Sequence, residues 1–288
     1  MTIKKGMTKA SGTLFLVFLL ISSAAVFMAL KVRTDAISRK KVPGSSIIFI
    51  PSGKYLKYAT FGFSSLAADF IYLWAIQYYS TYEIKDRFFY LDHIFSIIND
   101  LDPRYTDPYE IGSLIATQEA RDPKLALKIL DRGLERNPDN WFFPFEAAHV
   151  AQMSLKDLNL ARSYYEKAMA IPGAPELIKR NFANIAYKLM DYKTAWEMWK
   201  EVYETTANES IKNLAMGHLY QIKSAADVQT IKEALAKFKE KAGRLPSDLG
   251  QLVKAGILGD VPKDMDGKDY IYDALTGAVK PPTISWKR

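Results

Sequence analysis

The sequence predicts an all-α chain that consists of an N-terminal transmembrane helix, an α-solenoid of helix pairs and a small helix-plus-hairpin cap at the C-terminus. Three observations carry this prediction. A charge-free apolar run of 21 residues lies near the N-terminus, aspartates recur further along at intervals of 34 to 36 residues, and turn-rich sequence begins after Gly243. A fixed period of this length is typical of stacked supersecondary units.

The net charge of +7 comes from the N-terminal part of the chain. Residues 1–41 hold eight basic side chains and one acidic side chain, so the remaining 31 basic and 31 acidic side chains cancel. The folded part therefore lacks the basic footprint of a nucleic-acid binder, and we expect no nucleic-acid partner. The sequence contains no cysteine, which excludes disulfides and thiolate metal sites.

The apolar run predicts a membrane span. Residues 1–9 form a basic tail and residues 10–31 a helix, which at 1.5 Å per residue is long enough to cross the hydrocarbon core of ~30 Å. A cleaved signal peptide is the alternative, because Lys4, Lys5 and Lys9 resemble its basic start. The length of the run and the basic cluster that follows it favour a retained single span.

The next two segments connect this span to the helix pairs. Residues 32–57 are predicted to be a polar tether, in which Ser46–Ile50 either forms a short strand or packs under the first helix. Tyr58–Tyr82 is rich in aromatic residues, and Asp69 is its only charged residue. We expect it to be the first helix of the stack. An interfacial helix is an alternative, whereas a second span would cost about 2.5–3.5 kcal/mol for Asp69.

Residues 58–242 are predicted to form the helix pairs. Three copies of one pattern, an aspartate followed by an alanine, a large residue and a small one, begin with Asp122–Ala126, Asp157–Ala161 and Asp191–Ala195. Each aspartate is placed where the second helix of a pair begins, because a carboxylate there accepts free backbone N–H groups and faces the positive end of the helix dipole. The alanine, one turn later, allows the paired helix to approach closely.

Weaker copies of the pattern flank these three. Asp86 and Asp227 keep the spacing but lack the alanine. Because the outer faces of terminal units meet solvent or another element, such units are atypical in a finite stack. The sequence therefore predicts five helix pairs, of which three are regular.

The regular units resemble the tetratricopeptide repeat family in their alanines, in the bulky residues Leu130, Tyr165 and Trp199, and in the small residues Gly133 and Ala168. In that family the first helices line a concave groove that binds peptides or helices. The resemblance implies groove positions at Ile111, Ile115, Gln118, Glu146, Val150, Met153, Arg180, Asn184 and Tyr187.

A protein partner, held by apolar contacts and oriented by Arg180 and Glu146, is expected in this groove. The alternative is that single members of the set are only solvated surface. The first helices also depart from the family pattern. Leu114 and His149 stand where a small residue is expected, and only Ala183 fits.

Residues 243–288 are predicted to form the cap. A helix starting after Ser247 and stopping at Gly256 is followed by a hairpin of Tyr270–Asp273 and Ala278–Lys280. The segment resembles the C-terminal ends of type II secretion pseudopilins. The matching residues are Leu245, Pro246, Leu249, Leu252, Pro262, Asp264, Gly267, Tyr270 and Tyr272. A true pseudopilin is disfavoured because Val17 stands where a prepilin has glutamate.

The sequence indicates no catalytic centre. His93, His149 and His218 lie in different units, the first two on helical phases expected to be packed, and no phosphate loop, zinc motif or nucleophile elbow is present. We therefore expect no enzymatic activity, cofactor or small-molecule substrate. Asp264, Asp266 and Asp269 suggest either a calcium site or ordinary turns, and turns are favoured.

These observations predict a membrane-anchored scaffold for protein–protein interactions in a bacterial envelope assembly. A pilus or secretion context rests on the resemblance of the cap. The alternatives are a structural subunit of such a complex, or a secreted carrier or chaperone if the N-terminal segment is cleaved. The expected location is the bacterial inner membrane, with the soluble part more plausibly periplasmic than cytoplasmic.

Overall fold

The protein is described by a computed structural model that covers residues 3–35 and 50–282, with side chains from residue 15 in the first segment. Within these residues the chain is helical apart from turns and one two-stranded antiparallel sheet, so the predicted all-α class is confirmed. Of the Ser46–Ile50 patch, only Ile50 lies within the described residues. The chain divides into two compact units, residues 1–49 with 84–89 and residues 50–83 with 90–288.

The first unit contains one long helix, α1 (Ile3–Asp35). Its segment Phe15–Thr34, with a mean hydropathy of 2.4, is the one helix of the described residues that is long and apolar enough to cross a membrane. The hydroxyls of Ser22 and Ser23 donate to backbone carbonyls within the helix. They are thus satisfied locally, as an apolar environment requires. A signal sequence has the same composition.

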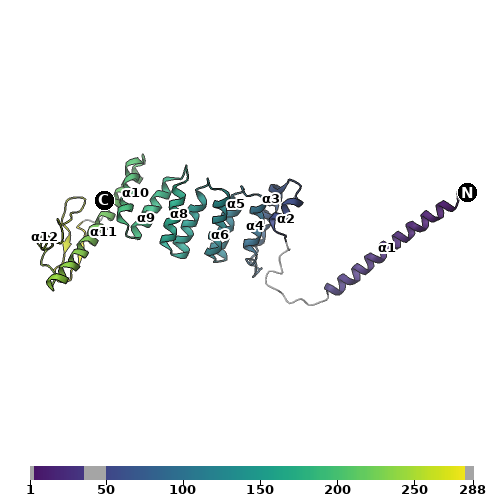
Figure 1. Cartoon of the computed structure of the whole chain (residues 1–288), viewed down its shortest axis with the longest axis horizontal. Helices are drawn as coiled ribbons and strands as arrows, with labels where there is room; N and C mark the ends of the chain where they lie inside the picture. Colours follow the sequence, from purple (N-terminus) through teal and green to yellow (C-terminus); the bar gives the residue numbers. More distant parts are fainter. Residues whose placement is uncertain (1–2, 36–49, 283–288) are drawn as a thin grey trace. The chain divides into compact units, whose positions relative to one another are not determined.

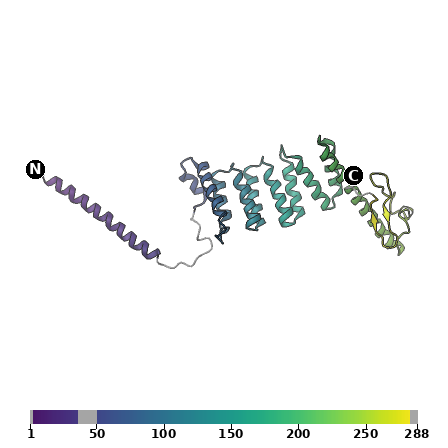
Figure 2. The same cartoon turned by 180° about the vertical axis from the view of Figure 1, so that it is seen from behind.

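The second unit is a row of antiparallel helix pairs followed by a long helix (Figures 1 and 2). The pairs are α3 (Ser64–Tyr79) with α4 (Leu91–Leu101), α5 (Asp107–Leu114) with α6 (Pro123–Arg136), α7 (Phe142–His149) with α8 (Leu158–Met169), and α9 (Glu176–Lys188) with α10 (Tyr192–Thr205). Two π-helical turns, η1 (Ile115–Glu119) and η2 (Val150–Leu155), extend α5 and α7. In both views the helices follow one another in chain order.

The same type of turn joins the two helices in each of the three regular units. The carboxylates of Asp122, Asp157 and Asp191 accept the N–H groups of Leu125 (3.0 Å), Leu160 (2.9 Å) and Thr194 (3.2 Å) and so cap α6, α8 and α10. The residue before each cap has a positive φ, namely 54° at Arg121, 59° at Lys156 and 62° at Met190. The left-handed residue reverses the chain, and the aspartate then starts the second helix.

The cores between neighbouring pairs follow the predicted pattern. Ala126, Ala161 and Ala195 are fully buried, and the bulky residue one turn later in each second helix is at most 1% exposed. The small residue that follows lets the next unit approach. A Cβ atom at Gly133 would lie only 2.8 Å from the ring of Phe143 on α7.

The ends of the row differ from the prediction. A short helix, α2 (Gly53–Ala59), occupies the end of the predicted 32–57 tether and packs on α4. The close approach depends on Gly53, where a Cβ atom would lie 2.5 Å from the Cβ atom of Asp100. The helix α4 begins at Leu91 and not at Asp86.

The predicted fifth helix pair is wrong. Asp227 lies in the interior of α11 (Glu209–Ala242), a continuous helix, and starts no second helix. Asn208 caps α11 by accepting the N–H groups of Ser210 and Ile211. Gly243, with φ of 69°, ends it. Since residues 209–242 contain no proline, nothing in the sequence breaks the helix where the repeat spacing would require a turn.

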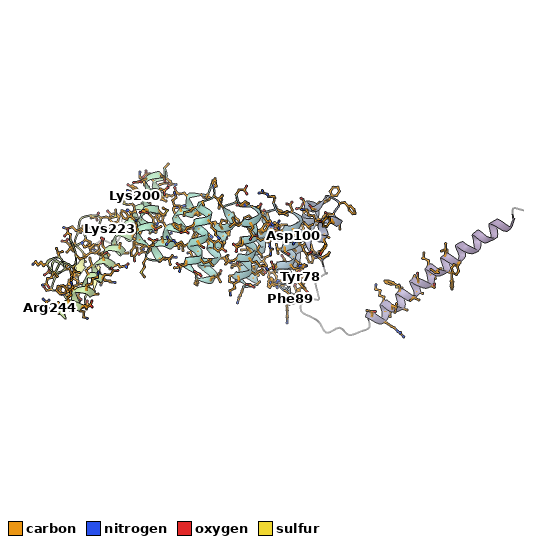
Figure 3. The ribbon with its side chains drawn as sticks, viewed as in Figure 1. Tyr78, Phe89, Asp100, Lys200, Lys223 and Arg244 are labelled. Carbon is orange, nitrogen blue, oxygen red and sulfur yellow. The ribbon has the colours of Figure 1, made fainter. Side chains whose placement is uncertain are left out.

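The C-terminal cap packs on the second half of α11, between Lys223 and Arg244 (Figure 3). It consists of α12 (Gly250–Lys254) and the paired strands β1 (Ile271–Tyr272) and β2 (Val279–Lys280). Its core is formed by Leu249, Leu252, Tyr270 and Val279 against Ile231, Ala234, Leu235 and Phe238. The first half of α11 belongs to a different core, which it shares with α9 and α10.

Candidate binding groove

The first helices of successive pairs line two adjoining hollows on one side of the row. The larger hollow, of about 530 Å³, lies between α5–η1, α7–η2 and α9. It is lined by Glu110, Ser113, Leu114, Thr117, Gln118, Phe142, Glu146, His149, Val150, Gln152, Met153, Ser154, Tyr165 and Asn181. The smaller hollow, of about 300 Å³, is lined by Gln152, Asn181, Asn184, Tyr187, Lys188, His218 and Gln221. Gln152 and Asn181 line both hollows, so the two form one groove.

The π-helical turns decide which residues reach this groove. The N–H of Asp157 donates to the carbonyl of Ala151 (3.0 Å), and the N–H of Asp191 donates to that of Ala186 (2.9 Å). The first of these loops contains one more residue, which is the residue that the π turn inserts. The same longer loop closes from Asp122 to Ala116 (2.8 Å). A residue that precedes a π turn therefore lies one position further from the capping aspartate than the equivalent residue in a unit without a π turn.

This displacement corrects the prediction for His149. Ser113, Ala148 and Ala183 are the small residues buried at equivalent positions, and all three are at most 6% exposed. Leu114 and His149 lie one position further on and face the groove. The first helices thus keep small residues at the helix contact. His149, which the sequence placed on a packed phase, has a side chain that is 36% exposed in the hollow.

Most of the predicted partner-binding residues line the groove, although their binding role stays a prediction. Gln118, Glu146, Val150 and Met153 line the larger hollow, and Asn184 and Tyr187 line the smaller one. Arg180 lies outside both hollows. Its Nε faces Oε1 of Glu176, one turn earlier on α9, at 3.6 Å. Glu110, Leu114, Thr117 and His149 were missed because the count from the caps ignored the inserted residue.

A polar cluster centred on His149 occupies the middle of the groove. Its Nε2 lies 3.4 Å from Nδ2 of Asn181 and its Nδ1 lies 3.6 Å from Oε1 of Glu146. A neutral imidazole with its proton on Nδ1 would direct that N–H at Glu146 and accept from Asn181 at Nε2. The ring of Phe145 meets the imidazole edge-on, with centroids 4.3 Å apart. These contacts hold His149 in place at the groove surface.

The groove has an acidic end at α5 and α7. Burial raises the pKa of Glu110, and the nearby carboxylates of Asp107 and Glu146 raise it further. Two carboxylates that repel each other across a hollow attract a ligand that brings a cation or hydrogen-bond donors. Lys188, at the other end of the groove, carries the opposite charge.

The far wall of the groove is built from α11. His218 stacks on the indole of Trp199, with ring centroids 4.1 Å apart, and burial lowers its pKa, although a hydrogen bond with Gln221 opposes this. At the floor of the groove, Tyr165 donates from its hydroxyl to Oε1 of Gln152 (3.3 Å), and burial raises the pKa of Tyr165. Burial favours the uncharged form of both rings.

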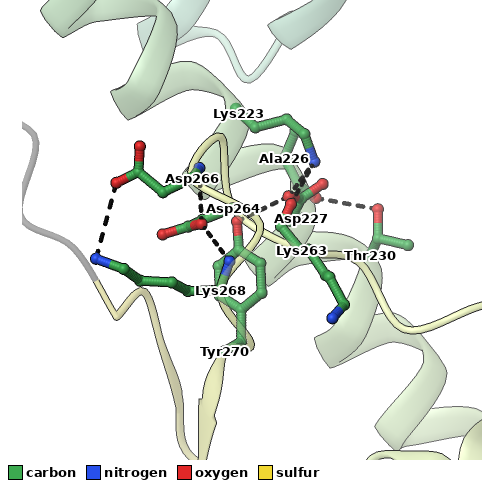
Figure 4. Close-up of polar contacts among 9 residues, drawn as sticks. All are labelled: Lys223, Ala226, Asp227, Thr230, Lys263, Asp264, Asp266, Lys268 and Tyr270. Atoms are coloured by element: carbon green, nitrogen blue, oxygen red, sulfur yellow. Dashed lines mark hydrogen bonds and ion pairs between the residues drawn. The ribbon is translucent and has the colours of Figure 1, made fainter.

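The polar residues of the cap hold turns and attach the cap to α11 (Figure 4). Tyr270 donates to Oδ2 of Asp227 (2.7 Å), Lys223 forms an ion pair with the same carboxylate, and Lys223 also donates to the carbonyl of Lys263 (3.1 Å). Asp264 accepts the N–H groups of Asp266 (2.9 Å) and Lys268 (2.8 Å).

The structure assigns turn-forming contacts to the aspartates that suggested a calcium site. Asp264 is 7% exposed and accepts two backbone N–H groups, and Asp269 faces Lys263 at 3.4 Å. Among the described residues, no group of three or more His, Asp or Glu side chains is placed to hold a metal ion. Asp264 thus acts as the acceptor that closes the loop.

The comparisons with known proteins give one distant structural similarity and no family. No protein-family model matches the chain, and no curated protein matches it in sequence. Among solved structures, one similar chain is described as "MamA RS-1 ArsTM double mutant". It is 17% identical, the match covers 53% of this chain and 91% of that chain, and the TM-score is 0.33. A similarity at this level carries no argument about function.

Proposed function

We propose that the protein is a membrane-anchored helical-repeat scaffold that binds a helix or peptide of a partner protein in the groove between α5 and α11. The observation that carries this proposal is the continuity of the two hollows across the first helices of three pairs and α11. A shallow surface of this kind suits an extended or helical segment better than a small molecule. The proposed role is binding, without catalysis or a cofactor.

The lining supports a partner segment with mixed chemistry. Leu114 and Met153 are more than half exposed and offer apolar contacts. Glu110 and Glu146 favour a basic or donor-rich part of the segment at one end, and Lys188 favours an acidic part at the other. The opposite charges at the two ends of the groove thus set the direction in which the partner segment binds. They take the orienting role that was expected of Arg180.

Membrane anchoring by α1 belongs to the same proposal. The apolar segment Phe15–Thr34 supports it, together with the basic residues on both sides of the run. We propose a single-pass protein of the bacterial inner membrane with the repeats on the periplasmic side. The envelope setting, with a pilus or secretion assembly as its context, rests on the sequence of the cap.

Two other roles fit the same fold. The chain is a structural subunit if the groove is permanently filled within a complex, and a soluble carrier if the N-terminal segment is removed. Intact-mass measurement on the membrane fraction separates the carrier from the others. A mature N-terminus beyond residue 30, in the soluble fraction, would contradict the anchored scaffold.

Photocrosslinking of the full chain tests the groove. A photoreactive amino acid replaces Met153, which lies in the groove and is 61% exposed, or Met190, which lies outside it and is 66% exposed. Irradiation of native membranes should link Met153 variants to one defined protein and leave Met190 variants unlinked. The added substitutions His149→Ala and Tyr187→Ala should abolish the link. Equal crosslinking at both methionines would place the partner elsewhere.

A further inference from the structure

Exposed apolar side chains gather on α2, on α3 and in the turn between them, and none of these residues lines the groove. These side chains are between 51% and 89% exposed. They are Tyr55, Tyr58, Phe61, Phe63, Leu66, Phe70 and Leu73, and together they are called the α2–α3 patch. Seven large apolar side chains exposed within residues 55–73 are typical of a surface that binds a membrane or another protein.

The helix α3 is apolar on two opposite faces. Ala68, Ala75 and Tyr79 are buried on the side that packs within the unit. Leu66, Phe70 and Leu73 follow one another at intervals of four and three residues, so they form one stripe about half a turn away from that buried side. A helix that is apolar all round is normally covered all round. Within residues 50–282, one face of α3 is covered and the opposite face is exposed.

The composition of the patch fits the surface of a lipid bilayer. Five of its seven members are aromatic, and tyrosine in particular is enriched at the level of the headgroups. Lys54 and Lys57 are exposed on α2, and residues 50–68 contain no acidic side chain. Lysines beside an apolar surface attract anionic lipid headgroups. Asp69 is exposed at the edge of the stripe, about 70° from its centre at 3.6 residues per turn, so a helix lying flat holds this carboxylate at the level of headgroups and water.

Chain connectivity keeps the patch near the membrane. The 14 residues 36–49 separate the end of α1 from Ile50, and a chain of this length spans at most roughly 50 Å. With α1 in the bilayer, which is part of the function proposed above, the patch cannot leave the vicinity of the surface. Tethering raises the effective concentration of the surface for the patch.

We propose that α2 and α3 lie in the headgroup layer of the bilayer, with Phe61, Phe70 and their neighbours inserted among the lipids. This is a second membrane contact that does not span. It commits the N-terminal end of the helix row to the membrane and leaves the groove residues of α7 and α9 free for a partner. A second copy of the chain or a partner protein on the patch would contradict it.

The absence of cysteine from the sequence makes the test direct, because any introduced cysteine is unique. The full chain is reconstituted into phosphatidylcholine vesicles that contain phosphatidylglycerol, with an environment-sensitive fluorophore attached to Phe61→Cys or Phe70→Cys. Phe27→Cys on α1 reports on the anchor, and Leu275→Cys, which is 93% exposed in the cap, is the matched control. Quenchers are lipids labelled either near the headgroup or near the end of the acyl chain.

The fluorophores on Phe61→Cys and Phe70→Cys should shift to the blue and be quenched most by the label near the headgroup. Phe27→Cys should be quenched most by the deep label, and Leu275→Cys by neither. Blue-shifted but unquenched fluorophores would show that a protein covers the patch, and deep quenching would show a second span. Either result overturns the inference and leaves the anchor standing, whereas an unquenched Phe27→Cys would overturn both.

Discussion

At the scale of single residues, the contact between Gly133 and Phe143 limits how closely two units can pack. A Cβ atom at Gly133 would lie between 2.8 and 3.0 Å from three ring atoms of a side chain that is fully buried. Because the ring has no space to move into, Gly133→Ala should lower the free energy of unfolding by about 1–3 kcal/mol. Urea unfolding followed by circular dichroism measures this change.

Gly217 on α11 provides the control for that substitution. A Cβ atom there meets no atom within 4 Å. Gly217→Ala should therefore stabilise the protein by up to about 1 kcal/mol, since alanine is the better helix former. The changes in the free energy of unfolding should therefore have opposite signs for Gly133→Ala and Gly217→Ala. A stabilising Gly133→Ala would mean that α6 and α7 are further apart than described.

Asp191 links two units through its charge as well as through its cap bond. It pairs with Arg162 on α8 at 2.9 Å. Although burial acts to raise its pKa, the hydrogen bonds from Thr194 and the ion pair with Arg162 hold that pKa below the usual value. Asparagine also caps helices well, so Asp191→Asn should cost about 0.5–1 kcal/mol at pH 7, mainly from the lost ion pair.

The pH dependence of this loss has a defined sign. A carboxylate with a lowered pKa contributes its stability above the unfolded value, which is about 3.9, and loses it as the pH falls through the folded value. The stabilities of the wild-type protein and Asp191→Asn should therefore converge as the pH falls below about 3.9 and through the lower folded-state pKa. Asp157→Asn, a substitution at the equivalent cap, should show a smaller difference at pH 7. Urea unfolding at several pH values measures this. If the free energies of unfolding of the two variants change with pH in the same way, the ion-pair contribution is refuted.

At the scale of helices, sequence patterns correctly predict the elements that depend on local signals. The same patterns give wrong positions where a π turn inserts one residue. The cap aspartates and the alanines one turn later give α6, α8 and α10 directly. The π turns have no side-chain signature, so counting back from Asp157 put His149 at the wrong position. The usable signal was the interval of 35 residues from Asp122 to Asp157, against 34 from Asp157 to Asp191.

The cap contacts of α11 could not be predicted from the repeat spacing for a different reason. Asp227 has the spacing of a helix start, yet it is an acceptor for Tyr270, which lies 43 residues further along the chain. A tertiary contact of this kind produces no periodic pattern in the sequence. The α2–α3 patch was ambiguous as well, since aromatic residues suit a buried helix and an interfacial one equally.

The inserted residue in η2 leads to a prediction about deletions. Ser154 is exposed within the π turn. Its deletion should convert η2 to regular helix with the loop length found between Ala186 and Asp191, because Ala148 and Ala151 stay packed. The free energy of unfolding of this variant should stay within about 1 kcal/mol of the wild-type value, the typical size of a surface change away from the core. Thermal unfolding measures it.

Deletion of Met190 is the matched control. The unit of α9 and α10 has no spare residue, and Met190 itself supplies the left-handed turn before the cap. Its removal should displace Asp191 from the start of α10 and cost more than about 3 kcal/mol, as the loss of a cap and of helix packing together implies. Equal losses for the two deletions would show that η2 is required for the fold.

At the scale of the whole molecule, α11 joins the groove to the cap. Its first half, with His218, packs against Trp199 of α10, and its second half, with Phe238, packs against the cap. Each half of α11 thus has its own core, although Met265 of the cap also packs against the first one. We expect the second core to open locally while the groove keeps its shape.

Asp227→Ala tests this independence. The substitution removes the acceptor of the hydroxyl of Tyr270, a buried residue, and the partner of Lys223, and an unsatisfied buried hydroxyl costs about 1–3 kcal/mol. Amide hydrogen exchange followed by mass spectrometry should become faster in residues 249–280 and stay unchanged in residues 176–205. Thr230→Ala, on the same helix, removes a hydroxyl that donates only to the carbonyl of Ala226 and should change neither region. Faster exchange in α9 and α10 as well would mean that α11 couples the cap to the groove, so that a partner bound to one would be sensed at the other.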